Sequence, residues 1–182
     1  MLNTKYFIMR SEQGPQVQRN PMALGNAWFV SDVKMVDNAD AELAALNDTT
    51  FNARTIAVVD KRFSDQLADL SVSADSTAAI ALESYAPNHL AYGYTASKPG
   101  LAVFSEIYFS KGWNAYLDGE LQPHLRANYV LRAMKLPEGQ HSVEFKFEPQ
   151  VYATGEQYSL AGSVLLLAFV GGGMFFGLSS KR

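Results

Sequence analysis

The chain has 182 residues, enough for one domain with a sizeable hydrophobic core; 48% of them are apolar and only 18% are charged. The formal net charge of −3 excludes the broad basic surface that nucleic-acid binding requires, so no nucleic-acid partner is expected. The absence of cysteine excludes disulfide bonds, thiolate metal sites and cysteine nucleophiles.

The N-terminal third mixes strand and helix patterns. Three segments predict extended or turn structure: residues 10–21 as a loop or hairpin, and residues 26–36 and 53–60 as strands. Between those strands, residues 37–48 predict a short helix with Asp37 or Asn38 as its cap. Asp40 and Glu42 then lie in the first turn, where we expect them to be solvated and to favour the helix dipole.

From residue 76 onward, tight-turn signals separate short apolar runs. The predicted strands lie within residues 76–97 (divided at Ala86-Pro87-Asn88), 100–109, 113–122, 127–136 and 140–148. Residues 100–109 are apolar on both faces, which indicates a central strand. Asp118-Gly119 predicts a two-residue hairpin, and the Pro-x-Gly turn in Leu136–His141 makes residues 127–136 the expected partner of 140–148. The pattern predicts a mainly β fold, an antiparallel sandwich or jelly roll with a short helical insert.

The C-terminal tail carries no charge over the 24 positions 157–180. As a helix this run would extend about 36 Å, enough to cross a hydrocarbon core of roughly 30 Å. The alternative is a buried C-terminal helix, but the run is apolar nearly all round and contains three consecutive glycines, which weaken a helix in water. Gly173 and Gly177 form a small-xxx-small spacing at which another membrane helix could pack. We therefore predict a single C-terminal transmembrane helix.

The charges after this run predict its orientation. Lys181 and Arg182 favour a cytoplasmic C-terminus by the positive-inside rule. This divides the chain into an extracytoplasmic β-rich domain, residues 1–151, and a transmembrane helix with a short basic end, residues 152–182.

One polar and aromatic stretch, residues 111–133, suggests a binding site. Trp113 and Tyr116 could stack on a sugar ring, and four neighbouring side chains could bind its hydroxyl groups: Asp118, His124, Arg126 and Asn128. The alternative is structural, since Asp118-Gly119 suits a turn and aromatic residues suit a half-buried strand. In that interpretation Arg126 pairs with Glu106 or Glu144 across the sheet. We interpret the stretch as a hairpin first and as a site second.

The sequence predicts no metal site, cofactor or catalytic residue. Its three histidines, His89, His124 and His141, fall on separate predicted strands without a metal-binding spacing.

Several motifs, in this order and spacing, resemble the C-terminal region of the YfhO-like family of bacterial membrane proteins. They are "LNTKYFI" (2–8), "NPMALGNAWFV" (20–30), "SYAPNHLAYGY" (84–94), "FSEIYFSKGWNAYLDGE" (104–120), "RANYVLRAMKLPEGQHSVEFKFEP" (126–149) and the closing apolar helix. The resemblance implies an extracytoplasmic domain and last helix of a polytopic protein that resembles lipid-sugar-dependent glycosyltransferases. It places the protein in the bacterial cytoplasmic membrane.

The family's multi-helix catalytic part has no counterpart in these residues, so we expect this chain to be inactive by itself. The resemblance implies an accessory role in cell-envelope glycan modification. The expected partners are the lipid bilayer, other transmembrane helices of a YfhO-like protein, and an envelope glycan or lipid-linked sugar. Two other functions remain open: a membrane-anchored carbohydrate-binding module, and a structural role in which Gly173 and Gly177 dock the helix against a partner helix and the β-sandwich only spaces it.

Overall fold

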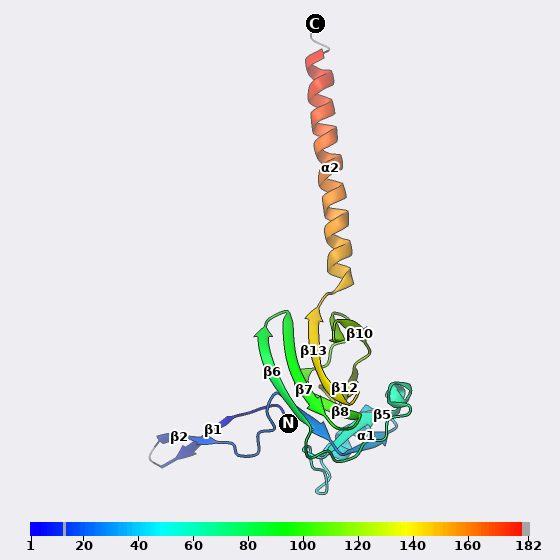
Figure 1. Cartoon of the computed structure of the whole chain (residues 1–182). Coiled ribbons are helices and arrows are strands. Elements are labelled where there is room, and N and C mark those ends of the chain that lie inside the picture. The colour runs from blue at the N-terminus through cyan, green and yellow to red at the C-terminus, as the bar shows by residue number, and fades with distance from the viewer. Residues whose placement is uncertain (13, 180–182) are drawn as a thin grey trace. The chain divides into compact units, whose positions relative to one another are not determined.

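The computed structural model describes residues 1–12 and 14–179, without the side chains of residues 153 and 173–179. The chain divides into two units, Met1–Phe147 and Glu148–Arg182. The first unit is mainly β-strand, as predicted, and the second contains the helix α2 (Figure 1).

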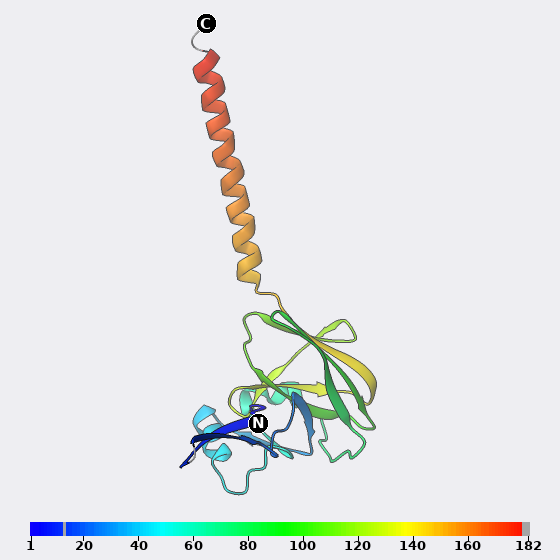
Figure 2. The same ribbon diagram turned by 90° about the vertical axis from the view of Figure 1, so that its left-hand side faces the viewer.

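Two large sheets make up most of the first unit (Figures 1 and 2). The five-stranded sheet has the order β10-β9-β13-β7-β6, with β6 (Ala79–Ala86), β7 (His89–Ala96), β9 (Trp113–Leu117), β10 (Glu120–Gln122) and β13 (Gly139–Phe147). The six-stranded sheet has the order β3-β8-β12-β11-β5-β4, with β3 (Ala27–Val30), β4 (Asp32–Val36), β5 (Ile56–Asp60), β8 (Gly100–Ile107), β11 (Leu125–Ala127) and β12 (Leu131–Leu136). The expected strand over residues 26–36 is therefore two strands, which separate at Ser31.

The central strands β8 and β12 of the six-stranded sheet are largely buried on both faces. Ala102 and Phe104 of β8 face the five-stranded sheet and pack with its inward side chains. Leu101 and Val103 face the opposite side, where they pack with residues that include Phe63 of the 3₁₀ helix η1 (Lys61–Leu67). Because successive side chains of a strand point to opposite faces, burial on both faces requires an unbroken apolar run. The prediction that residues 100–109 include a central strand is confirmed, since β8 lies between β3 and β12.

One predicted strand pairing and the expected wholly antiparallel arrangement are wrong. β12 does not pair with β13: it joins β8 and β11 in one sheet, while β13 joins β7 and β9 in the other. The turn between them therefore connects the two sheets. The burial of the strands agrees with this, since β12 is buried on both faces and β13 on only one. The sheets are also not wholly antiparallel, since β4 and β5 run parallel, with α1 (Ala39–Leu46) in their crossover connection.

The N-terminal strands β1 (Tyr6–Ser11) and β2 (Gly14–Arg19) form a separate hairpin. The hairpin alternative for residues 10–21 is therefore confirmed, although the paired region already begins at Tyr6. The hairpin pairs with neither large sheet, and its apolar side chains are exposed.

Helix α1 begins where the sequence predicted, but one of its acidic residues is buried. The side chain of Asn38 caps the helix by accepting a hydrogen bond from the backbone N–H of Ala41. Glu42, which we expected to be solvated, is 0% exposed. Its carboxylate lies 2.6 Å from Nη2 of Arg126 on β11 and accepts a 2.6 Å hydrogen bond from the backbone N–H of Tyr129. This contact joins the crossover helix to the sheet.

The second unit contains α2 (Gln150–Ser179), a helix of 30 residues. Large apolar side chains in its described part are exposed, including Leu160, Leu167 and Phe169 at 68%, 69% and 79%. Within the described part of the chain, no helix is both long enough and apolar enough to cross a membrane. The surroundings of Gly173 and Gly177, the predicted helix-packing residues, lie outside the described residues.

The buried contact of Glu42 provides a test of how α1 is held. We expect Glu42→Gln to lower the free energy of unfolding by about 2 kcal/mol, because it removes the nearer carboxylate of the largely buried Arg126 guanidinium and leaves only that of Asp60, at 3.9 Å. Denaturant unfolding of the purified chain measures the loss. Glu120→Gln is the matched control, since Glu120 is exposed, and it should leave stability unchanged. Equal stability of the two variants would contradict this role for Glu42.

Candidate functional site

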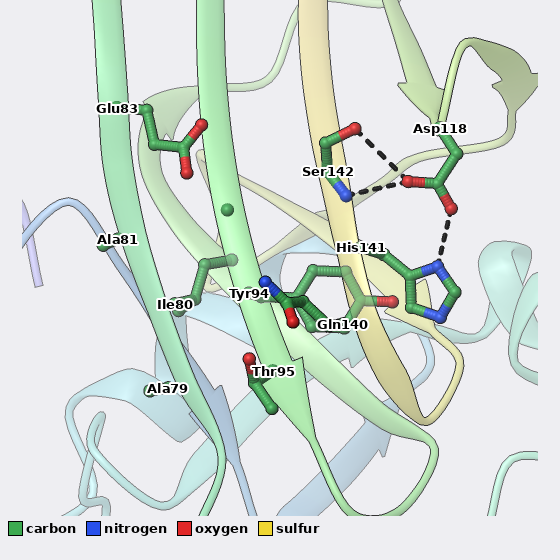
Figure 3. Close-up of a pocket in the computed structure, with 11 residues that line it drawn as sticks. Ala79, Ile80, Ala81, Glu83, Tyr94, Thr95, Asp118, Gln140, His141 and Ser142 are labelled. Atoms are coloured by element: carbon green, nitrogen blue, oxygen red, sulfur yellow. Dashed lines mark hydrogen bonds and ion pairs between the residues drawn. The ribbon is translucent and has the colours of Figure 1, made fainter.

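The outward face of the five-stranded sheet contains a groove. On β7, Leu90, Tyr92 and Tyr94 point into the core, and the alternate residues therefore point outward. Several of the outward side chains on β6, β7 and β13 are small. They leave a hollow of about 590 Å³ lined by Ala79, Ile80, Ala81, Glu83, Gly93, Tyr94, Thr95, Asp118, Gln140, His141 and Ser142 (Figure 3). A hollow of this size lies within the range of small-ligand sites.

Gly93 lies at the floor of this groove. A Cβ at this position would overlap Oε1 of Glu83, whose side chain reaches from β6 toward β7 (Figure 3). Glycine thus allows the Glu83 carboxylate to lie against the strand. Thr95 and Gln140 add a hydroxyl and an amide group to the lining. The groove therefore offers several acceptors and donors over a floor of small side chains.

Asp118 closes the opposite side of the groove, and the turn that it forms explains its position. Asp118 and Gly119 have φ values of 50° and 87°, and they connect β9 to β10 as the predicted two-residue hairpin. Asp118 Oδ1 accepts a 2.9 Å hydrogen bond from the backbone N–H of Ser142, where β13 extends beyond the end of β9. Asp118 Oδ2 lies 2.6 Å from Nδ1 of His141 (Figure 3).

These contacts shift the pKa values of both side chains. The hydrogen bond from the Ser142 backbone, followed by the contact with His141, lowers the pKa of Asp118 below its ordinary value of 3.8. The hydrogen bond to Asp118, followed by the one to the Glu138 carbonyl, raises the pKa of His141 above 6.5. The groove therefore has a carboxylate on each side, Glu83 and Asp118, and its lining includes no lysine or arginine. Because Asp118 is paired with His141, Glu83 is the carboxylate left to a ligand, and such a lining suits hydroxyl-rich ligands.

The two aromatic residues of the predicted site do not form one platform. Trp113 and Tyr116 are three residues apart on β9, so they lie on opposite faces of the sheet. Trp113 packs at the core edge, with the Arg132 guanidinium 4.1 Å from its ring centroid. Tyr116 lies on the outward face, with Lys146 Nζ 4.8 Å from its ring centroid.

Three other residues of the predicted site have structural contacts. His124 lies among aromatic rings, with the Tyr108 and Phe145 centroids at 5.3 and 5.9 Å; burial, followed by the charge of Arg132, lowers its pKa to about 4. Arg126 contacts Glu42 and not, as expected, Glu106 or Glu144. Asn128 is 0% exposed, and its side chain accepts a hydrogen bond from the backbone N–H of Val58.

Of the six predicted residues, only Asp118 lines the groove. Sequence reasoning missed Glu83, Gly93 and Gln140. The available signal was the run of small residues at the outward positions of the strands, where an exposed strand usually carries larger polar side chains. Among the described residues, no group of three or more His, Asp or Glu side chains could hold a metal ion.

The pair of Asp118 and His141 predicts a pH dependence of stability. Because the pKa of Asp118 is lowered in the folded state, its carboxylate stabilises the fold above pH 3.8, and this stabilisation is lost on acidification. Because the pKa of His141 is raised, its imidazolium stabilises the fold below pH 6.5, and this stabilisation is lost as the pH rises through the raised value. We therefore expect Asp118→Asn, which retains an Asn-Gly turn, to lower the melting temperature most between these two values and less at alkaline pH.

The matched control for this thermal unfolding series is Asp75→Asn. Asp75 also accepts hydrogen bonds from backbone N–H groups, those of Thr77 and Ser97, but its hydrogen-bond partners include no histidine. The loss of melting temperature caused by Asp75→Asn should therefore stay the same as the pH rises through the pKa of His141. Parallel pH profiles for the two variants would contradict the role of the pair.

Comparison with known proteins identifies the family. Residues 43–157, more than half of the chain, match the family described as "Bacterial membrane protein YfhO". The match extends from α1 through every strand of the five-stranded sheet to the first turns of α2. No curated protein and no solved structure matches the chain. The matched segment includes all the groove residues, and the chain belongs to the YfhO family of bacterial membrane proteins.

Proposed function

We propose that this chain is an extracytoplasmic accessory domain of a glycosyltransferase-type membrane protein that modifies cell-envelope glycans. The observation that carries the proposal is the family match over residues 43–157, which covers most of the β-rich unit and all of its groove. The groove has the chemistry of binding: side chains that exchange hydrogen bonds with a ligand over a shallow floor. In this role the domain binds the acceptor glycan, and another part of the membrane protein supplies the catalytic groups.

The proposal includes α2 in the membrane, with its C-terminus in the cytoplasm. Residues 157–179 of the helix carry no charge, and the apolar side chains of its described part are exposed around it. Exposed apolar surface of this extent favours contact with lipid or with neighbouring apolar helices. Neighbouring helices of the same membrane protein are the partners that this proposal implies.

The groups that line the groove favour a glycan as its ligand. Sugar hydroxyls both donate and accept hydrogen bonds, and they match carboxylates, amides and hydroxyls such as those of Glu83, Gln140 and Thr95. The Glu83 carboxylate, in a lining without lysine or arginine, favours a neutral or amine-bearing glycan. Trp113 is less suited to this role, because its ring is already stacked on Arg132.

Deletion tests the accessory role. We expect membranes that contain a polytopic member of this family to lose sugar transfer when the segment corresponding to residues 43–157 is removed, because the acceptor is then no longer held. Transfer from the lipid-linked donor to envelope glycan is the measurement. Immunodetection must show that the shortened protein still reaches the membrane. Undiminished transfer would exclude the accessory role.

A substitution at the groove floor tests ligand binding. Gly93→Leu places a side chain in the groove, and the atoms nearest to a Cβ there belong to the movable Glu83 carboxylate, so the fold should be retained. We expect this variant to lose retention on immobilised envelope glycan. Ser84→Leu is the matched control, because Ser84 is exposed on the neighbouring strand β6 but does not line the groove. Equal retention of both variants on the glycan would show that the groove is not the glycan-binding site.

A further inference from the structure

One end of the five-stranded sheet is distinguished by its connection to α2. β13 ends at Phe147, and β6, which runs in the same direction, ends beside it at the β6–β7 turn (Figure 1). The backbone N–H of Phe147 donates a 2.9 Å hydrogen bond to the carbonyl of Asn88 in this turn. The β8–β9 loop ends at Trp113, whose ring centroid lies 5.4 Å from that of Phe147. The β6–β7 turn and the β8–β9 loop (108–112) therefore lie at the end of the sheet where the chain continues to α2.

Large apolar side chains are exposed at this end. Tyr85 next to the β6–β7 turn is 66% exposed, and Ile107 and Phe109 at the β8–β9 loop are 56% and 49% exposed. Lys111 follows in the same loop and is also exposed. The β7–β8 connection at the opposite end has Ser97, Lys98 and Pro99 instead. Exposed apolar side chains also occur on the β1–β2 hairpin and at Leu121 of β10, but of these two ends of the sheet, the one next to α2 carries Tyr85, Ile107 and Phe109.

Chain length keeps the start of α2 near this end. Only Glu148 and Pro149 separate Phe147 from Gln150, where α2 begins, and three fully extended steps cover about 11 Å. The first turns of α2 carry two exposed tyrosines, Tyr152 and Tyr158. The junction thus has aromatic residues on both sides and a lysine on the loop side, and such residues are typical of the membrane–water interface, where rings lie at the headgroup level and lysine reaches phosphate.

We propose that the β8–β9 loop, together with Tyr85, contacts the headgroup region of a phospholipid bilayer. In this arrangement Ile107 and Phe109 enter the interface, and Lys111 binds lipid phosphate. The inference rests on the proposed insertion of α2 into the membrane. It adds that the β-rich unit is seated on the lipid surface by its own loop, in addition to being tethered by the helix. Seating by this loop would hold the groove at a set height above the bilayer.

The cysteine-free chain allows single nitroxide labels to test this contact. The full chain is reconstituted in vesicles of phosphatidylcholine and phosphatidylglycerol, with one label at Phe109→Cys, at Leu166→Cys in α2, or at Leu43→Cys. Leu43 is the matched control, because it is 46% exposed but lies on α1, at the β4–β5 end of the other sheet. Ile107→Cys is a second label in case Phe109→Cys disturbs the fold, which thermal unfolding of each labelled chain detects.

Collisions with oxygen, which is enriched in lipid, and with a water-soluble nickel chelate are measured by electron paramagnetic resonance. We expect the oxygen-to-nickel accessibility ratio of the Phe109 label to exceed that of the Leu43 label several-fold, with the Leu166 label higher still. If Leu166 is in lipid but Phe109 matches Leu43, the loop contact is overturned while the membrane insertion of α2 stands. If the Leu166 label is aqueous, the insertion fails and the loop contact fails with it.

Discussion

Three aromatic rings hold the two large sheets together. Tyr92 of β7, Phe104 of β8 and Phe145 of β13 are 0% exposed and meet edge to face, with centroid separations of 5.0, 6.2 and 4.9 Å. Each pair gains quadrupole attraction in addition to the burial of apolar area. Because β7 and β13 direct these rings inward, their alternate positions must face outward, and the groove forms there. The core contact therefore determines which residues are available to a ligand.

The same alternation explains why the proposed glycan site is shallow and polar. A strand with large inward side chains can carry small outward ones without losing its core, and Gly93 and Ala81 have that position. Asp118 then closes the groove from a neighbouring hairpin, held by the backbone of Ser142 and by His141. A rigid sheet supplies the floor, and a short turn supplies one wall. This arrangement supports binding and positioning of a glycan by the β-rich unit, which is the role proposed for it.

Sequence reasoning was most successful where a local pattern decides the structure. The Asp118-Gly119 hairpin, the Asn38 cap and the central position of β8 each depend on a few adjacent residues, and all three are confirmed. It was wrong where a partner is chosen over distance. β12 and β13 are joined by a short turn, but each pairs in a different sheet. Arg126 finds its carboxylate in Glu42, 84 residues earlier in the chain.

The sequence by itself determined the mainly β class, most of the strands and turns, the uncharged C-terminal run and the motifs of the family. These follow from turn chemistry and from the period of apolar residues, which are properties of neighbouring positions. Only the tertiary structure decided that Trp113 stacks on Arg132, that Glu42 and Asn128 are buried, and that Glu83 and Asp118 lie on either side of one groove. The reason is physical: a side chain's partner depends on which strands share a sheet, and that choice is made by packing of the whole core.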